Sequence, residues 1–249
     1  MPNAFIEIAD YLTYYLAGTT RHGLHSPFIY DFADFVLYQP SDMNFEMIEN
    51  QRMNMIKSRS KSPQTSLSKY AAETTLDAKY GRLLQRIVRY YQPLSILEIG
   101  NNTGIESNYL LSNSIINHQT LSTYQSFEVD DYFQKVRKET LESFANYYNS
   151  DLLANSKILD KDKDKLVEIC VLYGQKNADD SWRFYDQYKH NLGTQSMLIM
   201  TNIRNSNDHY INWNQMTNLP EVTASIELFK MGILFFRTEQ IKQKFILRY

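Results

Sequence analysis

The stretch Ser95–Leu111, SILEIGNNTGIESNYLL, constrains the fold of this chain most strongly. An apolar run ends at Gly100, a second glycine follows at Gly104, and apolar residues with helical spacing begin directly after it. This order is typical of a βαβ unit, in which the first glycine allows a tight turn and the second lets the helix start close to the strand. The stretch therefore predicts a strand of a parallel sheet with a ligand-binding turn at its carboxyl end.

The pattern of apolar residues changes at Pro93. Residues 1–92 have mostly helical spacing, which predicts a helical N-terminal cap. From there to residue 249, short apolar runs alternate with helical patterns, and the runs MGILFFR and KFILRY predict a hairpin at the sheet edge. We expect an α/β fold: a Rossmann-like three-layer αβα sandwich over 93–249, with a mostly parallel sheet, an antiparallel C-terminal hairpin and a helical N-terminal extension.

Composition excludes several classes of protein. Apolar residues make up 43% of the 249 positions, which is enough for a sizeable core, and a net charge of −2 gives no footprint for nucleic acid. The single cysteine, Cys170, lies in an apolar run and fits a reducing compartment. The sequence shows neither a run of roughly 18 apolar residues nor the pattern of a secretory signal. We therefore expect a cytoplasmic protein without a membrane span.

Two carboxylates flank the glycine turn. Glu98 precedes Gly100 by two positions, and Glu128 ends the next expected strand, where an acid can accept hydrogen bonds from ribose hydroxyls. The spacing E-x-G-x-x-x-G differs from the pyrophosphate-binding G-x-G-x-x-G, and a carboxylate there favours a ligand that carries an ammonium or sulfonium group. The alternative is that Gly100 and Gly104 only serve turning and packing, as any αβα sandwich requires, and that Glu128 is a solvated strand end.

This arrangement resembles the class I S-adenosylmethionine-dependent methyltransferases. The blocks RHGLHSPFIYDF, KYGRLLQRIV, SILEIGNNTGIESNYL and PEVTASIELFKMGILFFR extend the resemblance over most of the chain, toward a bacterial O-methyltransferase-like branch. The resemblance implies S-adenosylmethionine as the cofactor. It also implies that Glu98 and the turn from Gly100 through Asn101 and Asn102 to Gly104 surround the methionine part of the cofactor, and that Glu128 holds the ribose.

The chain departs from these methyltransferases where their transfer chemistry lies. In that group an Asp-Gly-x-His-like turn and then an acidic pair follow two successive strands, and the acids bind a metal or steer the acceptor. Here Tyr173 and Lys176 occupy the first place, and Thr201 and Asn202 the second. Neutral Thr and Asn oxygens are poor ligands for a hard divalent cation. We therefore expect no metal site and assign no catalytic residue.

Two functions remain open. The first is metal-independent methyl transfer to an unknown small-molecule or protein acceptor, with space for that acceptor near Tyr173 and Thr201. The second is a catalytically inactive methyltransferase fold that acts as a binding or assembly module for a protein partner.

The segment TRHGLHSPF also has two interpretations. Arg21, His22 and His25 are polar residues among apolar neighbours, and they could form a lid or acceptor-binding segment over the cofactor pocket. Alternatively, they cap helix ends and satisfy buried carbonyl groups. No cysteine or well-placed acid completes a zinc ligand set with the two histidines.

Overall fold

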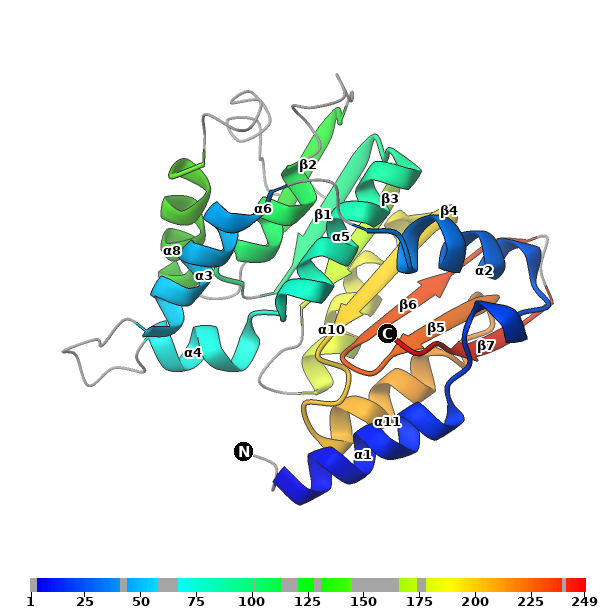
Figure 1. The fold of residues 1–249 in the computed structure, drawn as a ribbon. Coiled ribbons are helices and arrows are strands. Elements are labelled where there is room, and N and C mark those ends of the chain that lie inside the picture. The colour runs from blue at the N-terminus through cyan, green and yellow to red at the C-terminus, as the bar shows by residue number, and fades with distance from the viewer. Residues whose placement is uncertain are drawn as a thin grey trace.

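The computed structural model describes residues 4–40, 44–57, 67–100, 102–112, 121–127, 131–144, 166–173, 178–238 and 241–249. Within them the strands form one seven-stranded sheet in the order β2-β1-β3-β4-β6-β5-β7 (Figure 1). The strands are β1 (Ser95–Ile99), β2 (Thr123–Phe127), β3 (Val167–Leu172), β4 (Leu192–Thr201), β5 (Ala224–Leu228), β6 (Met231–Phe235) and β7 (Gln243–Ile246). The helices include α1 (Ala4–Ala17), α2 (Pro27–Phe32), α3 (Glu46–Lys57), α4 (Leu67–Thr74), α5 (Ala78–Tyr91), α6 (Ile105–Leu111), α8 (Asp131–Glu142), α10 (Asp179–Tyr188) and α11 (Asn207–Met216).

Strand β1 lies inside the sheet, as the glycine-turn stretch predicts. It pairs in parallel with β2 on one side and with β3 on the other, so that Ile99 has Phe127 and Leu172 as its two neighbours. All five of its residues are buried, which suits an unbroken apolar run covered on both faces. The carboxyl ends of β1, β2, β3 and β4 therefore meet at one edge, the edge where open parallel sheets bind ligands.

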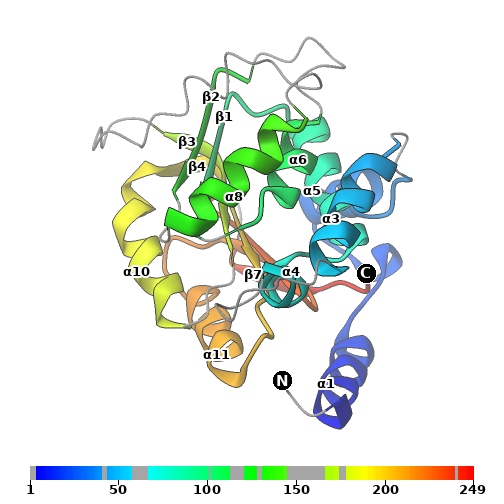
Figure 2. The ribbon, with the colours of Figure 1, turned by 90° about the vertical axis from the view of Figure 1, so that its left-hand side faces the viewer.

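Helices cover both faces of the sheet (Figure 2). Because side chains alternate along a strand, Ile96 faces the core that α2, α5 and α6 share, whereas Leu97 faces the core beneath α10 and α11. The predicted three-layer αβα sandwich is thus confirmed. Glu98 shares the face of Ile96, and this parity directs its side chain toward α6.

The N-terminal segment is helical where it is described, from α1 to α5. Its residues Ile29 and Leu84 belong to the same hydrophobic core as Ile226 of β5, so packing continues across Pro93. The division at residue 92 stays a prediction of domain organisation. Of the described helices, none combines the length and apolarity that crossing a lipid bilayer requires.

The C-terminal hairpin forms, but its partners differ from the expected ones. Strand β6 pairs antiparallel with β5, through partners such as Ile226 and Ile233, and it is inserted between β5 and β4. The run KFILRY supplies β7, which lies parallel to β5 at the sheet edge. The expected pairing of MGILFFR with KFILRY is therefore wrong. The reason is the connection between β5 and β6, which consists only of Phe229 and Lys230. Such two-residue connections join antiparallel neighbours, and their tight turns use residues with positive φ, as Phe229 has with 55°.

Candidate functional site

The turn between β1 and α6 has a backbone that requires glycine at two positions. Gly100 has a φ of 101° and Gly104 a φ of 86°, both in the left-handed region that side chains disfavour. The Gly100 amide donates to the Phe127 carbonyl of β2 at 2.9 Å. The buried Asn102 side chain accepts from the Gly104 amide at 2.7 Å through its Oδ1. The turn is therefore braced by its own side chain and by the neighbouring strand.

Gly104 also has a packing function. A Cβ atom built on it would lie 2.9 Å from Cβ of Thr140 and 3.1 Å from the Arg137 carbonyl oxygen, both in α8. Such contacts are too short for a real side chain, so the turn can pass against α8 only with glycine here. The packing interpretation of Gly104 thus has direct structural support, and it is compatible with a bound ligand on the other side of the turn.

Glu98 is completely buried at the carboxyl end of β1. Its Oε2 accepts a hydrogen bond from the hydroxyl of Tyr124 in β2, and its Oε1 accepts one from the hydroxyl of Tyr173, which directly follows β3. Arg137 donates to the Tyr124 hydroxyl at 3.0 Å. Burial, together with the Glu98 charge, raises the pKa of both tyrosines well above 10, so both remain protonated donors. The carboxylate beside the turn is thus already held by two phenol groups.

Glu106, in the first turn of α6, is a second buried carboxyl group that the sequence analysis missed. Its Oε1 accepts from the Leu76 amide at 2.7 Å, whereas its Oε2 is buried and has no hydrogen-bond partner among the described residues. Burial, together with the charge of the nearby Glu98, raises the pKa of Glu106 to about 7. The sequence signal for this residue was an acid directly after the glycine turn. The sequence pattern alone predicts that such an acid is exposed to solvent.

Three buried polar atoms without a partner gather at this end of the sheet. They are Oγ1 of Thr103, Oε2 of Glu106 and Oγ of Ser126, and none has a hydrogen-bond partner in the part of the chain that the structure describes. Ser126 stands directly beside Glu98 in the pairing of β2 with β1. Since almost all buried polar atoms in folded proteins are hydrogen-bonded, such a group indicates a place for a polar ligand or water. These atoms therefore leave hydrogen-bonding capacity at the turn that polar groups of a ligand or a water molecule can satisfy.

The carboxyl ends of β3 and β4 are closed by the chain itself. Thr201 at the end of β4 is buried, and Asn202 after it donates through Nδ2 to the Thr74 carbonyl at 3.1 Å. The segment from Thr74 to Leu76 is thus tied to Asn202 at one end and to Glu106 at the other. The side on which an acceptor was expected is therefore covered by N-terminal residues.

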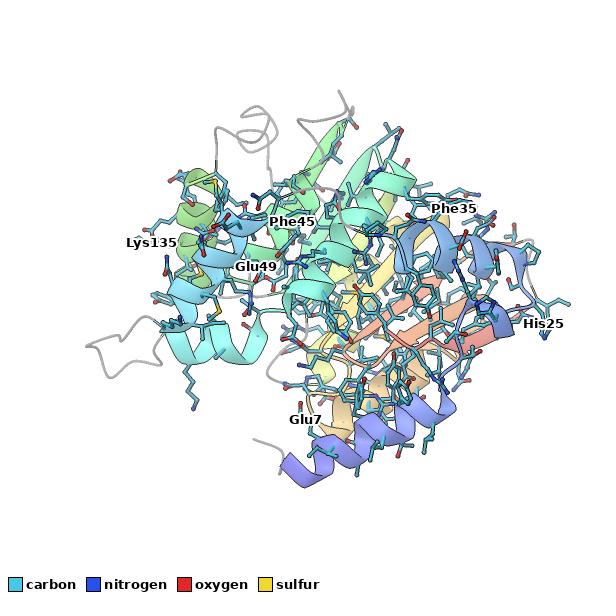
Figure 3. The ribbon with its side chains drawn as sticks, viewed as in Figure 1. Glu7, His25, Phe35, Phe45, Glu49 and Lys135 are labelled. Atoms are coloured by element: carbon cyan, nitrogen blue, oxygen red, sulfur yellow. The ribbon has the colours of Figure 1, made fainter. Side chains whose placement is uncertain are left out.

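The structure does not bring the RHGLHSPF segment to the glycine turn. Thr19 forms a bridge with Leu247 beyond β7, and four strands separate β7 from β1. Arg21 pairs with Asp34 at 2.6 Å. His22 is exposed, and Figure 3 shows the likewise exposed His25 at the outer edge of the molecule beside α2. A lid role over the turn would require this segment to move across the sheet.

Three residues of the predicted site, Asn101, Glu128 and Lys176, lie outside the described residues. Their roles stay predictions. Within the described ranges, no group of three or more His, Cys, Asp or Glu side chains is placed to hold a metal ion. Arg204, which follows β4, pairs with Glu227 of β5 and stacks on Tyr210 of α11, with 3.8 Å between guanidinium and ring centre.

Comparison with known proteins identifies the fold. No protein-family model and no curated protein matches the sequence. Among solved structures, a Podospora anserina methyltransferase bound to S-adenosylhomocysteine has a TM-score of 0.53 at 10% identity, over 80% of this chain and 99% of that one. A Geobacter sulfurreducens methyltransferase has a TM-score of 0.51 at 12% identity, over 80% and 91%. A Bacillus cereus O-methyltransferase in complex with S-adenosylhomocysteine has a TM-score of 0.50 at 13% identity, over 80% and 93%. With its glycine turn after a central strand and its C-terminal antiparallel hairpin, the chain has the fold of the class I S-adenosylmethionine-dependent methyltransferases.

Proposed function

We propose that the protein binds S-adenosylmethionine at the turn from Gly100 to Gly104 and transfers its methyl group, without a metal, to an acceptor. The observation that carries this proposal is the group of buried polar atoms around the turn that have no hydrogen-bond partner among the described residues. The methionine part of the cofactor has an ammonium and a carboxylate group, which can supply the missing donors and acceptors. The S-adenosylhomocysteine bound in two of the solved methyltransferases supports the same assignment.

The residues of this chain hold the ligand in the proposed reaction but provide no ready base. The left-handed glycines let the backbone approach the cofactor, whose sulfonium supplies an activated methyl group. The pKa of Tyr173 is raised well above 10 by burial and by Glu98, so its hydroxyl does not take a proton near neutral pH. Transfer would therefore depend on alignment and on an acceptor that is nucleophilic without help from the protein, such as an amine or a thiol.

Calorimetric titration with S-adenosylmethionine and S-adenosylhomocysteine tests the binding step. Thr103→Val is the informative variant, because it removes an unpartnered buried hydroxyl without changing the shape of the side chain. We expect it to stabilise the ligand-free protein by about 1 kcal/mol and to weaken cofactor binding several-fold. Gly100→Val should abolish binding, and Gly18→Ala is its control at a glycine without a left-handed backbone. The absence of heat and of a thermal shift with both ligands would contradict the proposal.

A second function, a binding or assembly module without catalysis, is favoured by one specific observation. The hydroxyls of Tyr124 and Tyr173 donate hydrogen bonds to the two carboxylate oxygens of Glu98, and Asn202 donates one to the Thr74 carbonyl. The side on which an acceptor was expected is therefore filled by the chain itself. Incubation with methyl-labelled cofactor and fractions of small molecules and proteins separates the two functions. Labelled product that is lost in Gly100→Val supports transfer, whereas cofactor binding without product in any fraction supports the module.

A further inference from the structure

Helix α1 presents an apolar stripe to solvent. Its exposed members share one side of the helix and are Ile8, Tyr11, Leu12, Tyr15 and Leu16. They follow the spacing i, i+3, i+4, i+7 and i+8, which places them on one continuous face. The exposed fractions reach 59% for Ile8 and 78% for Leu16, whereas Tyr14 is buried against the body of the protein. Contiguous exposed apolar patches of this kind mark interaction surfaces.

The stripe forms one wall of a groove. Helix α1 lies at the outside of the molecule in both ribbon views (Figures 1 and 2). A groove of about 420 Å³ is lined by α1, by Tyr80 at the start of α5 and by Phe229 in the connection between β5 and β6. Ile8 and Leu12 line the groove from the helix side, and Glu7 and Lys79 are among its charged residues. A partner that covers the stripe can therefore also contact the body of the protein.

The spacing and the charges around the stripe define its occupant. Apolar residues at alternating intervals of three and four match the seam between two packed helices. Glu7 lies at the start of the stripe, and the Arg248 guanidinium lies at its end, 4.5 Å from the centre of the Tyr15 ring. Neither makes an ion pair among the described residues. In an antiparallel pair of α1 helices, each Glu7 comes opposite the Arg248 of the other copy.

A lipid surface fits the stripe less well. The charged residues of α1 are Glu7 and Asp10, and the helix contains no lysine or arginine. Amphipathic helices that lie on membranes carry basic residues beside the apolar face, because cellular membrane surfaces are anionic. The acidic helix would be repelled by such a surface, so the charge pattern favours a protein occupant.

We propose that a second copy of this chain covers the stripe, with the two α1 helices antiparallel across a two-fold axis near Leu12. The apolar side chains of each helix fill the gaps between those of the other, and Glu7 and Arg248 pair at both ends. The contact uses no residue of the glycine turn, so the proposed dimer is independent of the proposed cofactor binding.

Sedimentation equilibrium of the full chain over a concentration series from about 1 to about 100 μM tests the contact. We expect the wild type to dimerise reversibly within this range and Leu12→Arg to raise the dimer dissociation constant at least tenfold. Leu94→Arg is the matched control, because Leu94 is 51% exposed and Leu12 is 53% exposed, and it should leave dimerisation unchanged. Circular dichroism of both variants checks that the fold is retained.

Charge reversal tests the orientation of the two helices. Glu7→Lys and Arg248→Glu should each weaken dimerisation about threefold, and their combination in one chain should restore it, because the pair then forms with opposite signs. A parallel arrangement would show no restoration and would overturn the proposed geometry. A wild type that stays monomeric throughout the series, or that binds vesicles of phosphatidylcholine and phosphatidylglycerol as a monomer, would overturn the proposal as a whole.

Discussion

The carboxyl end of β1 and the carboxyl ends of β3 and β4 lie at the same edge of the sheet but satisfy their polar groups differently. Around the β1 turn, buried oxygen atoms of Thr103 and Glu106 have no hydrogen-bond partner in the part of the chain that the structure describes. At the other two strands, Tyr173 bonds to Glu98 and Asn202 bonds to Thr74. The second region is therefore completed by the chain, whereas our proposal assigns the open positions of the first region to the cofactor.

This difference separates two kinds of expected effect. Where the chain provides both partners of a buried hydrogen bond, removing one of them leaves the other buried without a partner and lowers the free energy of unfolding. Where a partner is missing, removing the orphaned group costs little stability and lowers ligand affinity instead. Substitutions at the carboxyl ends of β3 and β4 should therefore lower the free energy of unfolding. Substitutions of the unpartnered groups at the β1 turn should lower ligand affinity.

Glu98→Leu should have the largest effect, because Glu98 joins the two regions through both tyrosine hydroxyls. Two buried donors lose a charged acceptor, and we expect the free energy of unfolding in urea to fall by about 4 kcal/mol. Glu168→Leu is the control, since Glu168 is only partly buried and accepts a single amide hydrogen bond, from Leu94. Equal losses in the two variants would show that the tyrosine contacts contribute nothing specific.

The pH dependence of stability should depend strongly on Glu106. Its pKa is about 7 in the folded protein and 4.5 as the reference value, so the folded state holds the proton more tightly between these limits. The wild type should therefore lose about 3 kcal/mol of stability as the pH rises through that window, a loss that Glu106→Gln avoids. Urea unfolding at about pH 5 and about pH 8 measures the difference. A difference between the two proteins that does not change with pH would contradict the assignment.

Gly104→Ala should destabilise the turn by about 2 kcal/mol, because alanine must adopt a φ of 86° and its Cβ meets Thr140. Thermal and urea unfolding measure this loss. At Gly18 an added Cβ is crowded to a similar degree, 3.0 Å from Cγ of Arg248 and 3.1 Å from the Tyr14 carbonyl oxygen, but the backbone lacks a left-handed φ. Gly18→Ala should therefore cost clearly less, and the reverse order would argue against a strained turn.

The smallest effect is expected at Asn202. Asn202→Ala removes the hydrogen bond to Thr74 and places alanine at a φ of 54°, which together should cost about 1 to 2 kcal/mol. Asn202→Gly loses the same hydrogen bond but tolerates the backbone, so it isolates the contact. Hydrogen exchange at the Leu76 amide should become faster in both variants if the covering segment depends on this contact. Unchanged exchange would show that Glu106 alone holds the segment.

The sequence is sufficient for the local features of the fold. The alternation that begins at Pro93 predicts the strands and helices of the sandwich, and the spacing of Gly100 and Gly104 predicts the turn, because both depend on neighbouring residues. Three apolar runs at the C-terminal end have the same pattern, so their pairing could not be read from it. The short connection at Phe229 was the available clue.

The features that the sequence analysis missed depend on contacts between distant parts of the chain. Glu98 and Tyr173 are 75 positions apart, and Glu106 meets Leu76 across 30 positions. No local pattern encodes which acid becomes buried or which tyrosine turns inward. The RHGLHSPF segment shows the same limit, because its place beside β7 follows from the bridge between Thr19 and Leu247 rather than from its own residues.

That bridge has a consequence for the order in which the protein can fold during synthesis. The Tyr14 hydroxyl donates to the Leu247 carbonyl, 233 positions later. Next to this contact, the Thr19 amide donates to the Ile246 carbonyl and the Arg248 amide donates to the Thr19 carbonyl. Helix α1 is translated before all the other described elements, yet its docking strand is the last of the described strands to be translated. Tyr14 therefore stays uncovered until β7 has emerged. We expect this late closure to slow folding, because contacts between distant parts of a chain form late.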